Sequence, residues 1–186
     1  MLKQFYPYEY EESVFTIDYN KLFEKGYKAI LFDIDNTLVP HGEDSTEQVD
    51  ELIHFIQGIG FKTLFLSNNS DERIRSFLKN IDSLYICEAD KPQTQNYLKA
   101  LEMLGVKKDE AVVIGDQVFT DVLGANRSGI ASILVKFIRR KDEKKIGKRR
   151  RVEQVILMLY SLNKSCCNRI GDIHKKEIKE NVVEER

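Results

Sequence analysis

The chain has 186 residues, of which 42% are hydrophobic and 32% charged, and its formal net charge is −1. This length and apolar fraction exclude a disordered chain and predict a single domain, and no run approaches the roughly 18 apolar residues of a membrane-spanning helix. Three cysteines without CxxC spacing exclude a disulfide framework, and the first residues carry no secretory signal, so we expect a cytoplasmic protein.

The first apolar segment, Ala29–Phe32, is short and lacks strict polar alternation, which is typical of a strand buried on both faces of a parallel sheet. Asp33 and Asp35 follow it and, in extended chain, point to the same side. Two close carboxylates repel each other, so their pKa values should separate: one attacks as an anion while the other holds a proton and acts as acid, then base. Thr37 could cap this turn and donate to a phosphate.

Apolar and helix-like stretches alternate along the rest of the chain. Further strands are predicted over 63–66, 84–87, 111–114 and 133–135. Helices are predicted over 46–57, 71–78, 93–104, 121–128 and 152–163. This alternation predicts right-handed βαβ units and an α/β fold: a doubly wound, mainly parallel, Rossmann-like sheet with helices on both faces. Ligands of such sheets bind beyond the C-terminal ends of the strands.

Polar residues follow the later strands as well. Ser67 and Asn68 supply a hydroxyl and an amide that could hold a phosphoryl oxygen, and Lys91 supplies a positive charge. Asp116 ends a later strand, and Asp121 follows five residues on. If these clusters share one edge of the sheet, they make up a set of groups suited to phosphoryl transfer.

A metal ion is predicted at the same edge. Asp33 and Asp116 offer hard oxygen ligands, which suit Mg²⁺, and this ion takes its remaining ligands from water and substrate. We therefore expect Mg²⁺ as the cofactor and a phosphorylated molecule as the substrate.

Positive charge is concentrated near the C-terminus. Residues 136–153 carry 10 basic against 3 acidic side chains, giving +7, whereas residues 1–135 carry 13 against 22, giving −9. Such a block is expected to contact anions such as phosphate groups, acidic lipid or nucleic acid. A solvated loop that keeps the chain soluble is the alternative.

The helix over 152–163 carries one apolar stripe, which we expect to pack on the core. From Ser165 onward the chain is polar and is expected to fray. The predicted organisation is one domain over 1–163, followed by a polar tail over 164–186. The domain comprises a core over 28–135, a basic segment over 136–151 and the C-terminal helix over 152–163.

Four motifs occur in order: DIDNTL (33–38), LFLSN (64–68), ADKP (89–92) and GDQVFTD (115–121). With them the chain resembles the haloacid dehalogenase (HAD) superfamily of phosphohydrolases over roughly residues 28–135. The resemblance implies that Asp33 is the nucleophile that forms an aspartyl-phosphate, and that Asp35 is the general acid and base. It implies that Ser67 binds the phosphate and that Lys91 stabilises the nucleophile and the transferring phosphoryl group.

The resemblance also implies the metal ligands. Asp116 would hold Mg²⁺ together with the carboxylate of Asp33 and the backbone carbonyl of Asp35. Asp121 matches the last acid of the fourth motif, which lies near the metal or orients Lys91.

Within this superfamily the second acid indicates a phosphatase, because the dehalogenases lack it and the transport ATPases carry threonine there. Only 28 residues separate Leu38 from Ser67, and 22 separate Asn68 from Lys91. Neither gap has room for a cap domain, so we expect an open site that accepts large or surface-held substrates. A capless enzyme can also gain a lid by forming a homo-oligomer.

Among capless members, subclass IIIA, the chain most resembles the YqeG-like branch, which includes phosphatidylglycerophosphate phosphatases. The matched features are DIDNTLV with Pro40, the SNN run at 67–69, ADKP and GDQxxTD. This resemblance implies a phospholipid headgroup as substrate and peripheral contact with the inner face of an anionic membrane. The basic block would dock there, so replacing Arg149, Arg150 and Arg151 should lower activity on vesicles alone.

Two alternatives stay open. The first is a phosphatase of a soluble phosphometabolite with a solvated basic segment. The second is an RNA- or partner-binding protein with a vestigial site, which the second acid at Asp35 disfavours because a pure binding protein does not need it.

Overall fold

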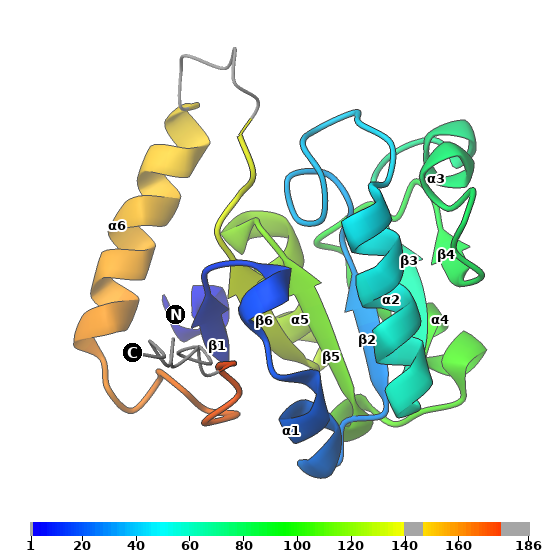
Figure 1. The fold of residues 1–186 in the computed structure, drawn as a ribbon. Coiled ribbons are helices and arrows are strands. Elements are labelled where there is room, and N and C mark those ends of the chain that lie inside the picture. Colours follow the sequence, from blue (N-terminus) through cyan, green and yellow to red (C-terminus); the bar gives the residue numbers. More distant parts are fainter. Residues whose placement is uncertain (1, 140–146, 176–186) are drawn as a thin grey trace, which may run out of the picture.

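The computed structural model describes residues 2–139 and 147–175 (Figure 1). Six parallel strands form one sheet in the order β1-β6-β5-β2-β3-β4. The strands are β1 (Glu9–Glu11), β2 (Ala29–Phe32), β3 (Lys62–Leu66), β4 (Leu84–Ile86), β5 (Ala111–Gly115) and β6 (Ala131–Val135). The expected doubly wound α/β fold is thereby confirmed.

Helices connect the strands and cover both faces of the sheet. The α-helices are α1 (Tyr19–Glu24), α2 (Glu47–Ile59), α3 (Asp71–Phe77), α4 (Thr94–Leu104), α5 (Leu123–Ser128) and α6 (Lys148–Leu162). The shorter turns are η1 (Leu2–Phe5), η2 (Val14–Thr16), η3 (Lys108–Glu110) and the π-helical η4 (Val118–Val122). The sequence did not predict β1 or α1, and the first two residues of the helix expected over 121–128 belong to η4.

Alternate residues of the central strands enter two separate cores. Ile30 and Phe32 of β2 pack with α1, α2 and α3. Leu31, between them, packs with α4 and α5 on the opposite face. Because every residue of β2 is buried, the strand reads as an unbroken apolar run, which is why its bounds follow from the sequence.

The site carries no cap domain. Residues 2–139 are described without a break, and within them the connection from β2 to β3 contains α2 and that from β3 to β4 contains α3. The expectation that neither connection holds a cap domain is therefore confirmed.

Helix α6 lies beside β1 and β6, at the opposite end of the sheet from β4 (Figure 1). Ile156 and Tyr160 are buried against residues of η1, η4 and β6. The expectation that one stripe of this helix packs on the core is wrong for Val152, Val155 and Leu159, whose exposed fractions are 52%, 55% and 36%. The apolar residues are spread over two faces of the helix, and only one face meets the core.

The fraying expected from Ser165 does not occur in the part of the tail that the structure describes. Cys166 and Ile173 are buried. The backbone N–H groups of Ile170 and Gly171 donate to the Glu9 carboxylate, each at 2.7 Å. Two apolar side chains and a shared carboxylate thus hold 165–175 against the start of the chain, while 140–146 and 176–186 lie outside the described residues. None of the described helices is long and apolar enough to cross a membrane.

Candidate active site

The motif residues gather beyond the C-terminal ends of β2, β3 and β5, around a pocket of about 210 Å³. Its lining comprises Asp33, Asp35, Asn36, His41, Ser67, Asn68, Asn69, Lys91, Gln117, Thr120 and Arg149. All eight candidate site residues lie at this edge: five line the pocket, Thr37 and Asp121 bond to the lining residues Asp33 and Lys91, and Asp116 directly precedes Gln117 of the lining. The four motifs, separated by up to 88 positions, are thus brought to one place by the parallel sheet.

Asp33 is fixed on three sides. Its backbone N–H donates to the Ile114 carbonyl at 2.9 Å, which extends the pairing of β2 with β5 by one residue. Its Oδ1 accepts from Lys91 Nζ at 2.6 Å and its Oδ2 accepts from Thr37 Oγ1 at 2.7 Å. Asn36, at φ +64°, turns the chain so that Thr37 comes back to Asp33. The carboxylate is therefore held in one orientation.

Lys91 lies between two acids. Its ammonium, 4% exposed, also donates to Asp121 Oδ1 at 2.7 Å, and its backbone N–H is held by Asn68 Oδ1 at 2.8 Å. Burial acts to lower the pKa of Lys91, but the charges of Asp121 and Asp33 outweigh it and raise the pKa. Of the two roles expected for Asp121, this geometry favours the orientation of Lys91.

The glycine of the fourth motif leaves room for Asp121. A Cβ atom at Gly115 would lie 2.4 Å from Asp121 Cγ. The second carboxylate oxygen, Asp121 Oδ2, accepts the Gln117 N–H at 3.0 Å. Close packing of one buried acid against β5 explains why only glycine fits before Asp116.

Asp116 has a partner that the sequence did not predict. Its carboxylate Oδ2 pairs with Arg150 Nη2, and its backbone oxygen accepts from Arg150 Nη1 at 2.6 Å. The other carboxylate oxygen, Oδ1, lies 3.4 Å from Thr37 Oγ1, on the side of Asp33. Arg150 thereby takes one oxygen of Asp116 and leaves the other beside the Asp33 carboxylate.

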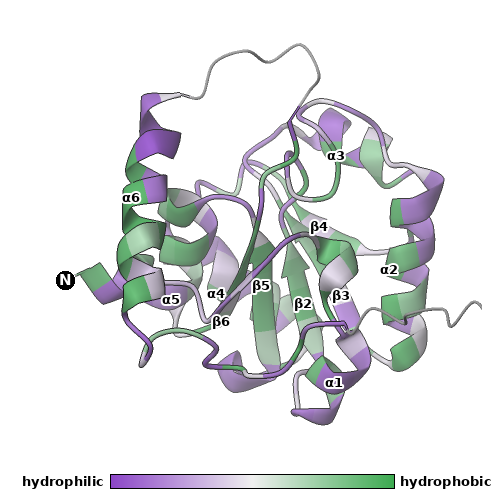
Figure 2. Ribbon diagram, turned by 60° about the vertical axis from the view of Figure 1, so that its left-hand side comes forward, coloured by the Kyte–Doolittle hydropathy of each residue, from purple (hydrophilic) through white to green (hydrophobic). Residues whose placement is uncertain are grey.

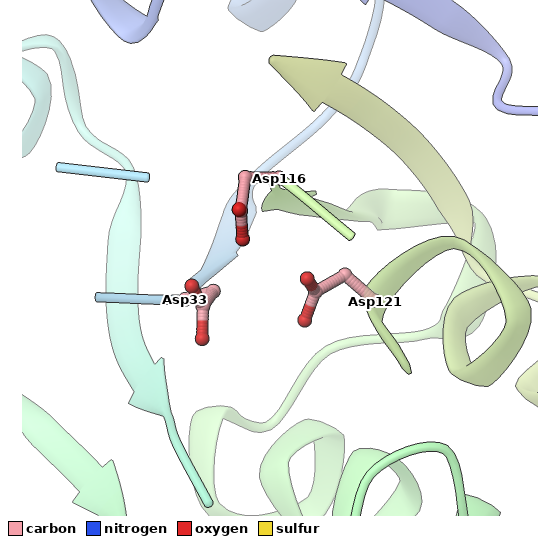
Figure 3. A group of neighbouring side chains, drawn as sticks. All are labelled: Asp33, Asp116 and Asp121. Carbon is pink, nitrogen blue, oxygen red and sulfur yellow. The ribbon is translucent and has the colours of Figure 1, made fainter. Parts of the chain in front are cut away.

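The acids fit a divalent cation. Oxygen atoms of Asp33, Asp116 and Asp121 lie within 4.8 Å of one another (Figure 3). Burial raises the pKa of Asp33 to about 6, and burial together with the charge of Asp33 raises the pKa of Asp116 to about 8. Burial and the neighbouring carboxylates both disfavour the ionised acids here, and a cation would relieve that penalty. Hard carboxylate oxygens at this spacing suit Mg²⁺.

Asp35 lines the same pocket, and its hydrogen-bond partners differ from those of Asp33. Its Oδ1 accepts from the Gly42 N–H and from Arg73 Nη2, each at 2.9 Å, and its Oδ2 pairs with Asn69 Nδ2. Burial acts to raise the pKa of Asp35, but the Gly42 N–H and Arg73 outweigh it and lower the pKa. The pKa values of the two acids do separate, but in the order opposite to the one expected: Asp33 is raised and Asp35 lowered.

Ser67 and Asn68 both line the pocket, as expected for phosphate contacts. Ser67 Oγ accepts from Asn69 Nδ2 at 3.0 Å, and among the described residues its hydroxyl donates to none. That proton is available to an oxygen atom in the pocket. Asn68 holds the Lys91 backbone, so it supports the lysine besides facing the pocket.

Three residues have contacts in the site that the sequence did not predict: Asn69, matched only as part of the SNN run, Arg150, expected only to dock, and Arg73, for which no role was expected. Arg73 lies in the first turn of α3, five residues after Asn68, and a cation so close to a motif was a usable signal. Arg150 lies in a run of three arginines, where nothing in the composition distinguishes it.

The chain is similar to known proteins. A family model described as HAD-hydrolase-like matches residues 88–156. The chain is 38% identical over 137 residues to the probable phosphatase YqeG of Bacillus subtilis (strain 168), covering 73% of this chain and 80% of that protein. It is 25% identical over 152 residues to phosphatidylglycerophosphate phosphatase 1, chloroplastic/mitochondrial, of Arabidopsis thaliana, covering 76% of this chain and 44% of that protein.

Among solved structures, an uncharacterized protein from Listeria monocytogenes serotype 4b superposes with a TM-score of 0.52 at 22% identity. The match covers 72% of this chain and 99% of that one. At this identity the likeness shows a shared fold.

Proposed function

The chain belongs to the HAD-like hydrolases, in the family of the probable phosphatase YqeG, and we propose that it is a Mg²⁺-dependent phosphomonoesterase that works through a phosphoryl group on Asp33. The observation that carries this proposal is the setting of Asp33, which lines the pocket, accepts hydrogen bonds from Lys91 and Thr37, and lies next to the Asp116 carboxylate. A cation held by Asp33 and Asp116 would neutralise charge on the transferring phosphoryl group.

In the first step a carboxylate oxygen of Asp33 attacks the phosphorus atom, and the bond from phosphorus to the ester oxygen breaks. Asp35 gives its proton to the departing oxygen, so that the product leaves as an alcohol. Because the Gly42 N–H and Arg73 lower the pKa of Asp35, it gains that proton when the negative charge of a bound phosphate monoester raises its pKa. The hydroxyl group of Ser67 donates a hydrogen bond to a phosphoryl oxygen and keeps its proton.

In the second step water attacks the phosphorus atom of the acyl-phosphate. The bond from phosphorus to the Asp33 oxygen breaks, and Asp35, now a carboxylate, takes the proton of the attacking water. Inorganic phosphate leaves, Asp33 is free again, and Asp35 once more carries its proton. Lys91 stays paired with Asp121 throughout, which keeps its ammonium directed at Asp33.

Phosphate release from a soluble aryl phosphate tests this proposal. Asp33→Asn should lower the rate with Mg²⁺ by roughly a thousandfold or more, since loss of a nucleophile removes the whole pathway. EDTA should abolish the activity of the unaltered protein. Asp109→Asn, a change of an exposed acid in η3, is the matched control. Retention of activity in Asp33→Asn would overturn the assignment of the nucleophile.

We further propose that the substrate is phosphatidylglycerophosphate at a membrane surface, converted to phosphatidylglycerol. The exposed face of α6 supports this: it carries Val152, Val155, Met158, Leu159 and Leu162. Lys148 and Arg151 are exposed and, at spacings of three and four residues, lie on the same face. In Figure 2 the first turn of α6 is hydrophilic and the later turns are largely hydrophobic. An apolar face with a basic end fits an anionic lipid surface.

Arg150 has to be left out of the docking test expected from the sequence, because its guanidinium pairs with Asp116. Arg149 also lines the pocket. Replacing both would disturb the site itself, so a loss of activity on vesicles would not report on docking. A test of docking through the exposed face of α6 therefore requires substitutions of residues that do not line the pocket.

Val155→Glu provides such a variant, and Phe55→Glu, a change of a residue 50% exposed on α2, is its matched control. Phosphate release is measured from phosphatidylglycerophosphate in vesicles rich in phosphatidylglycerol and from the soluble aryl phosphate. Val155→Glu should lower only the rate on vesicles, and Phe55→Glu should change neither. Equal rates for both variants on vesicles would reject docking through α6. Failure of the unaltered protein to hydrolyse the lipid, with turnover of the aryl phosphate intact, would favour a soluble phosphometabolite.

A further inference from the structure

We propose that Arg150 of α6 is a positioning residue for Asp116, held in place by Glu153, so that α6 is part of the active site. This inference rests on the phosphatase function proposed above. It concerns residues outside the four motifs, since Arg150 lies 34 positions beyond Asp116.

The contact between the two residues is a fork. Arg150 Nη1 donates to the backbone oxygen of Asp116 at 2.6 Å, and Nη2 pairs with its carboxylate Oδ2. The Asp116 side chain is fully buried, and that of Arg150 is 19% exposed. Two donors of one planar group on two atoms of one residue fix the rotation of the Asp116 side chain, which a single bond would not do.

Glu153 fixes the guanidinium in turn. It is 4% exposed, and its Oε2 accepts from Arg150 Nη1 at 3.0 Å. Its Oε1 accepts the Val118 N–H at 3.1 Å. Val118 begins η4, the turn that carries Asp121. One carboxylate of α6 therefore reaches both acids of the fourth motif, Asp116 through Arg150 and Asp121 through the start of its turn.

The arrangement divides the oxygens of Asp116 between two partners. Arg150 takes Oδ2, and Oδ1 lies 3.4 Å from Thr37 Oγ1, which itself donates to Asp33 at 2.7 Å. Oδ1 is thus the oxygen presented next to Asp33, where the cation is expected. Partners of this kind orient metal ligands, and their loss typically lowers metal affinity by about 10- to 100-fold.

The neighbouring arginines do not share this role in the part of the chain that the structure describes. The guanidinium carbon of Arg149 lies 5.2 Å from the Phe119 ring centre, and Arg151 is exposed. Arg150 is also stacked on Phe137, with its guanidinium carbon 4.7 Å from the ring centre, which limits its motion. The contact with Asp116 is therefore specific to one residue of the run.

A positioning role and a mere charge effect predict opposite changes. If Arg150 acted only as a nearby positive charge, its removal would strengthen Mg²⁺ binding by relieving repulsion. If it positions Asp116, its removal frees the carboxylate to rotate, and Mg²⁺ binding weakens. The sign of the change in Mg²⁺ affinity decides between the two.

Calorimetric titration of the full chain with MgCl₂, without substrate, measures this sign. Arg150→Met should raise the Mg²⁺ dissociation constant by about 10- to 100-fold. Arg150→Lys should recover part of the loss, because a point charge reaches one oxygen where the fork reaches two. Glu153→Gln should weaken binding less than Arg150→Met. Arg127→Met, a change of an exposed arginine of α5, is the matched control.

Unchanged or tighter Mg²⁺ binding in Arg150→Met would overturn the proposal. Circular dichroism monitors folding, and if Arg150→Met fails to fold, the comparison of Arg150→Lys with Arg127→Met carries the test. The result is independent of turnover: if the unaltered chain binds Mg²⁺ but hydrolyses no phosphomonoester, the proposed function fails while the affinities still decide the role of Arg150.

Discussion

Replacing Lys91 by methionine should destabilise the fold more than any exposed lysine replacement. The Lys91 side chain is 4% exposed and pairs with Asp33 at 2.6 Å and with Asp121 at 2.7 Å. Methionine keeps the volume but leaves two buried carboxylates without their cation. Removing one partner of a buried ion pair costs about 3–5 kcal/mol. For a chain of this size that corresponds to a fall of roughly 6–20 °C in the melting temperature.

The stability lost in Lys91→Met should increase with pH. Burial already raises the pKa of Asp33 to about 6, and without Lys91 it rises further. A carboxyl with a raised folded pKa releases its proton first in the unfolded chain, so stability falls as the pH rises from the unfolded pKa, about 4, through the folded one. Between pH 4 and 6 both proteins lose this stability alike, because the pKa of Asp33 is raised in both; the difference between Lys91→Met and the unaltered protein should therefore grow from about pH 6 upward, towards the higher pKa of Asp33 in the variant.

Urea unfolding in EDTA measures this difference, with Lys28→Met as the matched control. Lys28 also pairs with an acid, Glu110, but its side chain is 59% exposed, so its loss should have little effect. The double variant Lys91→Met with Asp121→Asn should lose less than Lys91→Met alone, because one buried charge is removed with its partner. Equal stability of Lys91→Met and Lys28→Met at pH 7 would refute the argument from burial.

Further predictions concern the metal, the glycine before Asp116 and the setting of Asp35. Mg²⁺ at a hundred times its dissociation constant should raise the unfolding free energy by about 2.7 kcal/mol, and a melting curve unchanged by Mg²⁺ would speak against a metal site. Gly115→Ala should lower the phosphatase rate on the aryl phosphate, because its Cβ would meet Asp121 at 2.4 Å; full activity would show that the acid has room to shift. Arg73→Met should raise the pKa of Asp35 and move the descending limb of the pH–rate profile to higher pH; an unmoved limb would assign it to another group.

The sequence predicts the structure well at positions where the residue type is compatible with only one environment. β2 is buried on both faces, so its four residues form an apolar run whose limits are the limits of the strand. The acids that follow β2 and β5 have no place in a core without partners, so their position at the strand ends indicates a site. Neither conclusion needs the tertiary structure.

The edge strand β1 could not be predicted, because its residues Glu9 and Glu11 belong to types that are seldom buried. Their burial depends on partners far along the chain. Glu9 accepts the Ile170 and Gly171 N–H groups, and Glu11 lies 2.8 Å from His174 Nδ1. The same distant contacts explain why residues up to 175 pack against the fold although their composition indicates a tail.

The role of Arg150 was hidden for a similar reason. A run of basic residues indicates a solvated or docking segment, and composition does not show which member turns inward. Helical phase carries a weak signal, since Arg150, Glu153, Ile156 and Tyr160 recur at spacings of three and four and form the inner face of α6. The helix begins at Lys148, four residues before the apolar stripe, because arginine and lysine are good helix formers.

The central claim, that Asp33 carries the phosphoryl group, is tested most directly by trapping it. The full chain is mixed with an aryl phosphate and Mg²⁺, quenched in acid and treated with borohydride, which reduces an acyl-phosphate to the alcohol. Peptide mapping by mass spectrometry should then find homoserine at position 33, only with substrate, and none in Asp33→Asn. Steady turnover with an intact aspartate at position 33, or homoserine at another aspartate, would contradict the account.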